Sequence, residues 1–561
     1  MNTATQKRAT SLFLVGLFLT STLINSISAD PVNIPKFVSL VVFSSITLAI
    51  CLFSMKIKSI RQIGSLGVAT IIFAVAIILI AMNSKSDLAS QLYGVTGRNI
   101  GVFTLLGLAG FMIIGFLLSN ENLMEKLVVT LLAVTLLSAL YGFLQYLKLD
   151  PLTWDSDYGN IFGFVGNPNF QSAMMGLGAI GCVGHLFLGN QADKWRITSI
   201  ILVIMMLISV KITGSIQGYL IFALGLLFLL YSHFLKSVPS FLHVTFLTSI
   251  LFGPFSVFLF FVNFLESSAL VKEGSLQQRA TYWEVGLRIW NQNPIVGTGL
   301  DTFGESFRSQ RNLANIEAVN GTITNSAHNF FIDLLANGGL LLFLPFLFFV
   351  IKTILAIYKV LKSKKTISMP VKTIIGVWIG LFTQMLISPN QIALMVWFWA
   401  CTGAIIGYAS KLSSAENLTA DKKIWSKTKQ NSRPTQELAP AQILAAFMGV
   451  LISLLVSLPP YVASVKYLSA LKSGQVERIY ESASIFPTDV SRSVAIINAF
   501  SNNQFYSQAH SLALQTVERY PNSFAAWNEL YLIVNSLPSE KKIALLNMRR
   551  LDPENPQLNG D

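Results

Sequence analysis

The chain has 561 residues, of which 53% are hydrophobic and only 12% are charged. This composition is typical of a polytopic membrane protein. The net charge of +13 would be compatible with binding to nucleic acid, but the distribution of the basic residues along the chain, described below, argues against a nucleic-acid-binding protein. The three cysteines, Cys51, Cys182 and Cys401, all fall inside predicted membrane spans, so the sequence offers no disulfide framework and no CxxC metal site.

Apolar segments of 18 or more residues recur along the chain, and segments of this length cross a bilayer as helices. The pattern predicts 13 spans, with boundaries good to about 3 residues. They cover residues 11–29, 37–55, 65–83, 99–119, 126–148, 169–189, 196–212, 217–235, 240–265, 328–358, 369–388, 390–410 and 441–463. The expected fold class is all-α, a polytopic membrane protein of about 13 transmembrane helices.

The positions of lysine and arginine predict the orientation of the spans. With a cytoplasmic N-terminus, the cytoplasmic loops hold about 19 of these residues and the outside loops between spans about 10, five of them in one large loop. The excess positive charge thus faces the anionic inner leaflet, so nucleic acid is not expected as a partner. The first span ends in a segment that resembles a signal-peptidase site at Ala29, although a first membrane helix is the simpler interpretation.

This pattern divides the chain into four parts. Residues 1–265 carry spans one to nine, and residues 266–327 form a large external loop. Residues 328–463 carry spans ten to thirteen, with a cytoplasmic linker at 411–440. Residues 464–561 form an external tail.

The tail has the composition of a helical domain outside the membrane, with 9 Lys and Arg against 9 Asp and Glu. Its apolar residues follow a helical period, as in Ala509, Leu512, Ala513 and Val517. Three prolines, Pro487, Pro521 and Pro553, recur at spacings of 34 and 32 residues, close to the tetratricopeptide period. We expect tetratricopeptide-like repeats that bind a protein partner, with an ordinary helical bundle as the alternative.

The large loop holds residues that suit an anionic substrate. If residues 278–291 are helical, Arg279, Trp283 and Trp290 lie near one face, beside Tyr282. One guanidinium group can donate two parallel hydrogen bonds to the oxygens of a phosphate, and it stays charged at any working pH. Aromatic rings can stack on sugars. Arg288 lies in the same segment and is a further candidate for substrate binding. The alternative is an amphipathic interfacial helix, with tryptophan at the headgroups and arginine snorkelling to them.

His328 lies where the large loop meets the tenth span. An imidazole at a membrane boundary can accept a proton near neutral pH. On a helix, Asn329 and Asp333 share a face, whereas His328 and Asp333 are about 140° apart, so a direct His–Asp pair is not expected. We expect the other four histidines, His185, His233, His243 and His510, to be structural.

Three segments resemble the signature of the O-antigen ligase and polymerase family of membrane glycosyltransferases. They are Ser326-Ala-His328-Asn329 with Gly338, the series Arg279, Tyr282-Trp283, Pro294, Gly297-Thr-Gly299 and Phe303, and Gly166-Asn167-Pro168-Asn169. The resemblance covers about residues 160–400, and members of this family commonly carry tetratricopeptide-like repeats.

The resemblance implies a GT-C type fold in the bacterial cytoplasmic membrane. It implies a glycan donor on undecaprenyl diphosphate and a hydroxyl acceptor on a lipid, glycan or protein at the outer face. Arg279 would hold the diphosphate, and His328 would assist the acceptor or bind the donor. Tyr282, Trp283, Arg288, Asn329, Asn167 and Asn169 would contribute to substrate binding.

One position departs from the family pattern. Members often have an arginine in the short outside loop between spans seven and eight, where this chain reads Thr213-Gly-Ser-Ile-Gln217-Gly. Gln217 or the nearby Lys211 is the expected substitute. Asp155 and Asp157 spell a DxD motif, but outside the membrane no nucleotide sugar is expected, so we expect no metal and no cofactor.

A transporter or a flippase of lipid-linked glycans is the alternative function. Such proteins place ionisable residues and broken helices at the middle of the membrane. Here the span interiors are almost free of charge and the polar residues gather outside, which favours the enzyme. Whether that enzyme is a ligase or a polymerase stays open.

Overall fold

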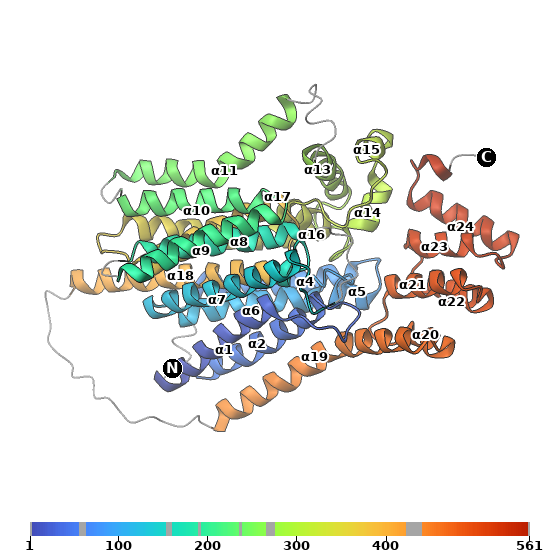
Figure 1. The fold of residues 1–561 in the computed structure, drawn as a ribbon, viewed down its shortest axis with the longest axis horizontal. Coiled ribbons are helices and arrows are strands. Elements are labelled where there is room, and N and C mark those ends of the chain that lie inside the picture. Colours follow the sequence, from blue (N-terminus) through green and yellow to red (C-terminus); the bar gives the residue numbers. More distant parts are fainter. Residues whose placement is uncertain are drawn as a thin grey trace.

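The computed structural model describes residues 3–54, 63–152, 160–188, 192–234, 238–264, 275–421 and 440–558. Over these residues the chain is helical and contains no strand, so the expected all-α class is confirmed. Figure 1 shows long helices lying alongside one another in a bundle, with a group of shorter helices beyond one end of it. That end, which also carries residues 275–329, is called the loop end below.

Thirteen long helices of the described chain form the bundle. They are α1 (Thr3–Thr22), α2 (Asn33–Phe53), α4 (Gly64–Asn83), α6 (Val102–Leu118), α7 (Glu121–Tyr146), α8 (Pro168–Leu186), α9 (Asp193–Ile212), α10 (Gln217–Phe234), α11 (Ser240–Phe264), α16 (Phe330–Lys362), α17 (Met369–Ile387), α18 (Ile392–Asp421) and α19 (Pro440–Ser473). The loops carry four further helices, α5 (Leu88–Tyr93), α13 (Ser275–Gln292), α14 (Phe303–Gln310) and α15 (Leu313–Ala318).

Each of the 13 predicted spans overlaps one of these long helices, and α18 and α19 continue beyond their predicted spans, to Asp421 and Ser473. Within the described ranges, nine are long and apolar enough to cross a membrane: α2, α4, α7, α9, α10, α16, α17, α18 and α19. Two other apolar stretches, α6 and Ser240–Gly253 of α11, are shorter. The chain is therefore a polytopic membrane protein, and the full count of 13 crossings stays a prediction.

The first helix ends earlier than the hydropathy pattern predicts. α1 stops at Thr22, whereas the predicted span runs to residue 29. Polar side chains explain the difference, because the Ser28 hydroxyl lies 2.7 Å from both Asn25 Oδ1 and the Asp30 carbonyl oxygen. Such local bonds compete with the helical ladder. Residues 23–32 consequently form a loop, called the first loop below.

Close backbone approach holds α18 against α6 in the centre of the bundle. A Cβ atom on Gly403 would lie only 1.8 Å from the Met112 carbonyl oxygen, so this contact requires glycine. Small residues serve membrane helices in this way because lipid tails give no hydrophobic drive to helix association. On the same helix, fully buried Trp397 donates through Nε1 to Ser21 Oγ at 2.8 Å, which ties α18 to α1.

A break in α16 joins this helix to the segment that follows α13. Gly339 has φ 56° inside α16, and a Cβ atom on Gly297 would lie 2.4 Å from the Asn337 backbone. The two segments pair through backbone hydrogen bonds, including Gly299 N to Asn337 O at 2.9 Å and Leu340 N to Pro294 O at 2.8 Å. Glycine allows both the positive φ and the close approach. This pairing fixes α13 beside the start of α16.

The tail consists of α20 (Val476–Ser482), α21 (Val490–Asn502), α22 (Tyr506–Arg519), α23 (Phe524–Leu532) and α24 (Pro538–Leu551), with its own apolar core. From α21 to α24 consecutive helices pack on one another, and α20 packs on α19, but the assignment of these helices as tetratricopeptide repeats stays a prediction. The tail contacts the loop end, where Arg311 forms two hydrogen bonds to the buried Asp552 carboxylate at 2.6 and 3.0 Å. Thr96 Oγ1 also donates to Asp489 Oδ2 at 2.5 Å.

A cysteine-labelling experiment tests the predicted orientation of the membrane spans. Ser473 is exposed at the end of α19, and we expect Ser473→Cys to react with a membrane-impermeant maleimide on intact cells or spheroplasts. Ser426→Cys, in the predicted cytoplasmic linker and outside the described residues, is expected to react only after permeabilisation. The three native cysteines are buried, which keeps the background low. The reverse labelling pattern would refute the orientation.

Candidate active site

The turn around His328 is held by Asp333. Asp333 Oδ2 accepts the Ser326 hydroxyl at 2.6 Å, and Oδ1 accepts the Ala327 amide at 2.7 Å. Ser326 Oγ also accepts the His328 amide at 3.0 Å, and His328 takes a left-handed φ of 54°. Asn329 then caps α16 by accepting the Phe331 amide at 3.0 Å. The carboxylate therefore orients the turn rather than the imidazole ring.

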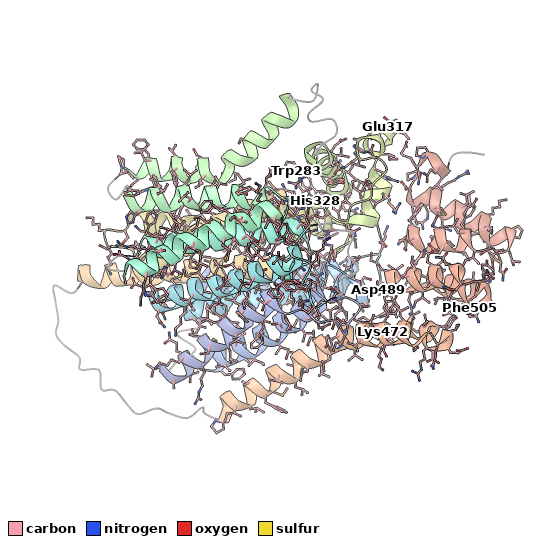
Figure 2. The ribbon with its side chains drawn as sticks, viewed as in Figure 1. Trp283, Glu317, His328, Lys472, Asp489 and Phe505 are labelled. Carbon is pink, nitrogen blue, oxygen red and sulfur yellow. The ribbon has the colours of Figure 1, made fainter. Side chains whose placement is uncertain are left out.

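His328 lies at the loop end of the bundle, on the side where the tail lies (Figure 2). Its ring is 5.5 Å from the Tyr282 ring, centroid to centroid, at an angle of 32°. Burial, followed by the positive charges of Arg279 and Arg98, lowers the pKa of His328 from 6.5 to about 4. The imidazole is therefore neutral at pH 7, which leaves one ring nitrogen as an acceptor, while the same surroundings make the ring a weaker base than a free histidine.

The helix that carries Arg279 forms as the sequence predicts, since α13 contains residues 278–291. Its aromatic residues differ from the expectation of an open stacking face. Tyr282 and Trp283 are 5% and 6% exposed and pack with Phe303 and Phe307 in the core of the loop. Neither sugar stacking nor anchoring among headgroups fits rings that are covered in this way. Tyr282 nevertheless remains in contact with His328.

Arg279 differs from the other arginines of the loop. Within the described residues it has no acidic partner, and burial lowers its pKa while Tyr282 raises it. Arg288 instead pairs with Glu284 and donates to Gln310 O at 2.6 Å, so it joins the helices of the loop. Arg308 and Arg311 both pair with Asp552 of the tail. Among these four side chains, only Arg279 keeps its charge available beside His328.

A cavity of about 580 Å³ opens next to His328. It lies between the first loop, the loops before α6, α8 and α16, and the turn between α17 and α18. Its polar lining includes Asp30, Arg98, Asn167, Ser326, His328 and Asn390. Asn167 also caps α8 by accepting the Asn169 amide at 2.8 Å. The cavity thus brings together side chains from five separate parts of the chain.

Arg98 is a site residue that the sequence reasoning missed. Its Nε lies 3.2 Å from Asp301 Oδ1, and it donates to the Asn325 carbonyl oxygen. Burial raises the pKa of Asp301, and the charge of Arg98 lowers it. The sequence pattern uses Arg98 only as one of the positive charges that predict the orientation of the spans. Its partners lie more than 200 residues away, so no local pattern links them to it. The usable signal in the sequence was the pair of residue types around it, Gly97 and Asn99, because glycine and asparagine favour the positive φ that both adopt in the structure.

The remaining predicted residues are placed as follows. Lys211 is exposed at the end of α9. Gln217 begins α10 and is 4% exposed, and neither of its side-chain amide atoms has a hydrogen-bond partner in the described part of the chain. The structure groups His328 with Arg279, Tyr282, Asn167 and Asn329, and it places Arg288 elsewhere in the loop. Asp155 and Asp157 lie outside the described residues, among which no cluster of three metal-ligating side chains occurs.

The arrangement is able to take a proton at a neutral imidazole and to stabilise an anion at an adjacent guanidinium. Residues 201–347, from α9 to the first half of α16, match the model of the Wzy_C family, which is described as O-antigen ligase. A comparison with curated proteins gives no match. The matched segment includes both Arg279 and His328. This polytopic chain therefore carries the O-antigen ligase domain of the Wzy_C family over residues 201–347.

Proposed function

We propose that the protein is a membrane glycosyltransferase that moves a glycan from undecaprenyl diphosphate to a hydroxyl acceptor at the outer face of the bacterial cytoplasmic membrane. The family match supports a membrane glycan ligase or polymerase. The observation that carries the finer proposal is the neutral His328 imidazole beside Arg279, whose charge has no acidic partner among the described residues. A base and a fixed positive charge are what transfer from a diphosphate leaving group requires.

In the proposed reaction, an acceptor hydroxyl attacks the anomeric carbon of the donor sugar. The new bond joins the acceptor oxygen to that carbon, and the bond from the carbon to the phosphate oxygen breaks with inversion. His328 takes the hydroxyl proton, and Arg279 stabilises the negative charge that develops on the departing diphosphate. Arg98 lines the cavity and adds positive charge near His328.

Metal independence is the first consequence of this mechanism. Since arginine supplies the charge that a metal would bring, we expect transfer to survive EDTA. The double variant Asp155→Ala plus Asp157→Ala is expected to keep most of the transfer activity, because the DxD motif has no role in the reaction. The measurement is transfer by reconstituted protein with and without chelator. Complete loss in EDTA with recovery on adding Mn²⁺ or Mg²⁺ would refute this expectation.

The tail, residues 464–561, is proposed to recruit or position a partner or acceptor and to do no chemistry. A chain truncated after Val465 keeps Ser464, which holds the first loop through hydrogen bonds to the Ala29 and Asp30 amides. We expect this truncated protein to retain donor hydrolysis or transfer to a model acceptor while glycan output in cells falls. A truncated protein that is stable yet inactive on model substrates would assign the tail to the active site.

Glycan profiling of a deletion strain tests the proposed function. Loss of a polymerase leaves glycans of a single repeat unit, whereas loss of a ligase leaves full-length glycan that is still attached to its lipid carrier. In either case, complementation with the wild-type chain restores the profile, and complementation with His328→Ala does not. An unchanged profile in the deletion strain would reject the proposal, and trapping of lipid-linked donor on the cytoplasmic side would favour a flippase.

A further inference from the structure

A second cavity, of about 520 Å³, lies at the end of the bundle opposite the loop end (Figure 1). It is formed where α10 and α16 end and where α11 and α17 begin. Its volume falls in the usual range for sites that bind small molecules. Four lysines line it, Lys362, Lys364, Lys365 and Lys372, and the cavity is called the lysine pocket below. The lysine pocket is thus separate from the candidate active site at the loop end.

The lysine pocket carries positive charge that no carboxylate neutralises. No acidic side chain occurs among the described residues that line it. Within the described part of the chain, Lys362, Lys364 and Lys365 make no ion pair, although Lys362 Nζ lies 5.8 Å from the centroid of the Tyr358 ring. Charges of one sign around one cavity repel each other, and an anion between them removes this repulsion. The pocket therefore suits an anionic ligand.

Lys372 places part of this charge at the edge of the membrane-spanning region. It is the fourth residue of α17, about one turn inside a helix that is long and apolar enough to cross a membrane. Its Nζ donates to the Ser232 carbonyl oxygen at 2.6 Å, which fixes the ammonium group against the last turn of α10. A lysine near a helix end reaches the level of the lipid headgroups in this way. Lys372 thus holds a fixed positive charge at the depth where lipid phosphates lie.

The surroundings of the lysine pocket favour a lipid over a free anion. Its lining includes Val238, Leu361 and Ile367, which are half-buried apolar side chains. On the two helices beside it, Phe234 at the end of α10 and Phe241 at the start of α11 are 67% and 66% exposed. An apolar ring exposed at this depth of a membrane protein meets lipid chains. A ligand that joins a phosphate to apolar chains contacts both the lysines and these rings, whereas free phosphate contacts the lysines alone.

We propose that the lysine pocket binds the phosphate headgroup of one anionic phospholipid of the cytoplasmic leaflet, with the acyl chains beside Phe234 and Phe241. The predicted orientation places this end of the bundle at the cytoplasmic face. Basic pockets between membrane helices on that side suit the headgroups of anionic lipids. A lysine ammonium group has three donors and no acceptor, so phosphate oxygens are matching partners. This binding site goes beyond the proposed function and takes no part in the transfer reaction.

Native mass spectrometry of the full-length protein in a neutral detergent tests this proposal. Phosphatidylglycerol, which is anionic, and phosphatidylcholine, which has no net charge, are titrated separately, and we expect the wild type to bind one phosphatidylglycerol more tightly. Lys364 and Lys365 are exposed, so their replacement leaves the core intact. We expect Lys364→Gln plus Lys365→Gln to weaken the binding of phosphatidylglycerol about 10-fold or more. Lys364→Arg plus Lys365→Arg keeps both charges and is expected to bind within about 2-fold of the wild type.

Lys126→Gln plus Lys359→Gln is the matched control. Both lysines are exposed, near the start of α7 and the end of α16, and neither lines the lysine pocket. The control removes the same charge and is expected to bind phosphatidylglycerol as the wild type does. Equal weakening by the two glutamine variants, or equal binding of both lipids by the wild type, would overturn the proposal, because the lysines would then act only as charges that orient the spans. Displacement of the lipid by an equal concentration of inorganic phosphate would also overturn it, since the pocket would then take a free anion. These measurements use no transfer, so their failure leaves the proposed function untouched.

Discussion

His328→Ala is expected to lower the transfer rate by about 10²–10⁴-fold at matched membrane expression, the range for loss of a general base. His328→Gln keeps a hydrogen-bonding side chain and is expected to retain donor binding while losing rate. Asp333 bonds to Ser326 and Ala327 rather than to the ring, so these substitutions leave the hydrogen bonds of the turn in place. Initial rates of transfer in proteoliposomes, with donor binding measured separately, check both variants.

The same imidazole predicts the pH profile. Since the pKa of His328 is lowered to about 4, first by burial and then by Arg279 and Arg98, the ring stays neutral from about pH 5 upward. We therefore expect kcat/KM to change little between pH 6 and pH 8 and to fall as the pH drops through about 4. Arg279→Gln removes one of the lowering charges and is expected to move this acid limb upward. A wild-type limb near 6.5 would contradict the assigned environment of His328.

Arg279→Ala is expected to lower transfer by about 10²-fold or more, the effect of removing one group that stabilises transition-state charge. Arg279→Lys is expected to fail nearly as badly, because an ammonium group cannot reproduce the paired hydrogen bonds of guanidinium. Kinetic constants at matched expression provide the measurement. Full activity of the lysine variant would show that a point charge suffices and that no bidentate contact is made.

Arg308→Ala is the matched control for Arg279. Its guanidinium lies 3.5 Å from Asp552 and 4.4 Å from the Phe524 ring, so it contacts the tail rather than His328. We expect a much smaller loss of transfer. Arg311→Ala is a poorer control because it leaves Asp552 buried without its closest partner, which weakens tail docking.

The sequence predicts the helices of this protein well because long apolar runs and the helical period are local properties. Every predicted span has a helix, and the predicted helix at 278–291 lies within α13. The predicted end of the first span is wrong because a mean hydropathy over many residues hides the contribution of single polar ones. The side chains of Asn25 and Ser28 bond to each other and stabilise a loop. That error matters for the candidate site, since the first loop contributes Asp30 to the lining of the cavity.

The site itself was predictable only in part. His328 and Arg279 stand in short segments with a recognisable pattern, and they lie near each other as that pattern implies. Arg98, Asp30 and Asn390 join them through the folding of distant loops, which no local pattern records. The burial of Trp283 was missed for the same reason, because Phe303 and Phe307, which belong to the same apolar cluster, follow about twenty residues later in a separate helix. Likewise, the pairing of Arg311 with Asp552 spans 241 residues.

The measurement that tests the central claim most directly is transfer of a labelled glycan from undecaprenyl diphosphate by purified, reconstituted protein. Wild type, Arg279→Ala, His328→Ala and Arg308→Ala are compared at equal protein amounts. The proposed site predicts transfer by the wild type and by Arg308→Ala, and losses of about 10²-fold or more for the other two variants. Near-normal transfer by both Arg279→Ala and His328→Ala, together with an inactive Arg308→Ala, would place the active site in the other half of the loop.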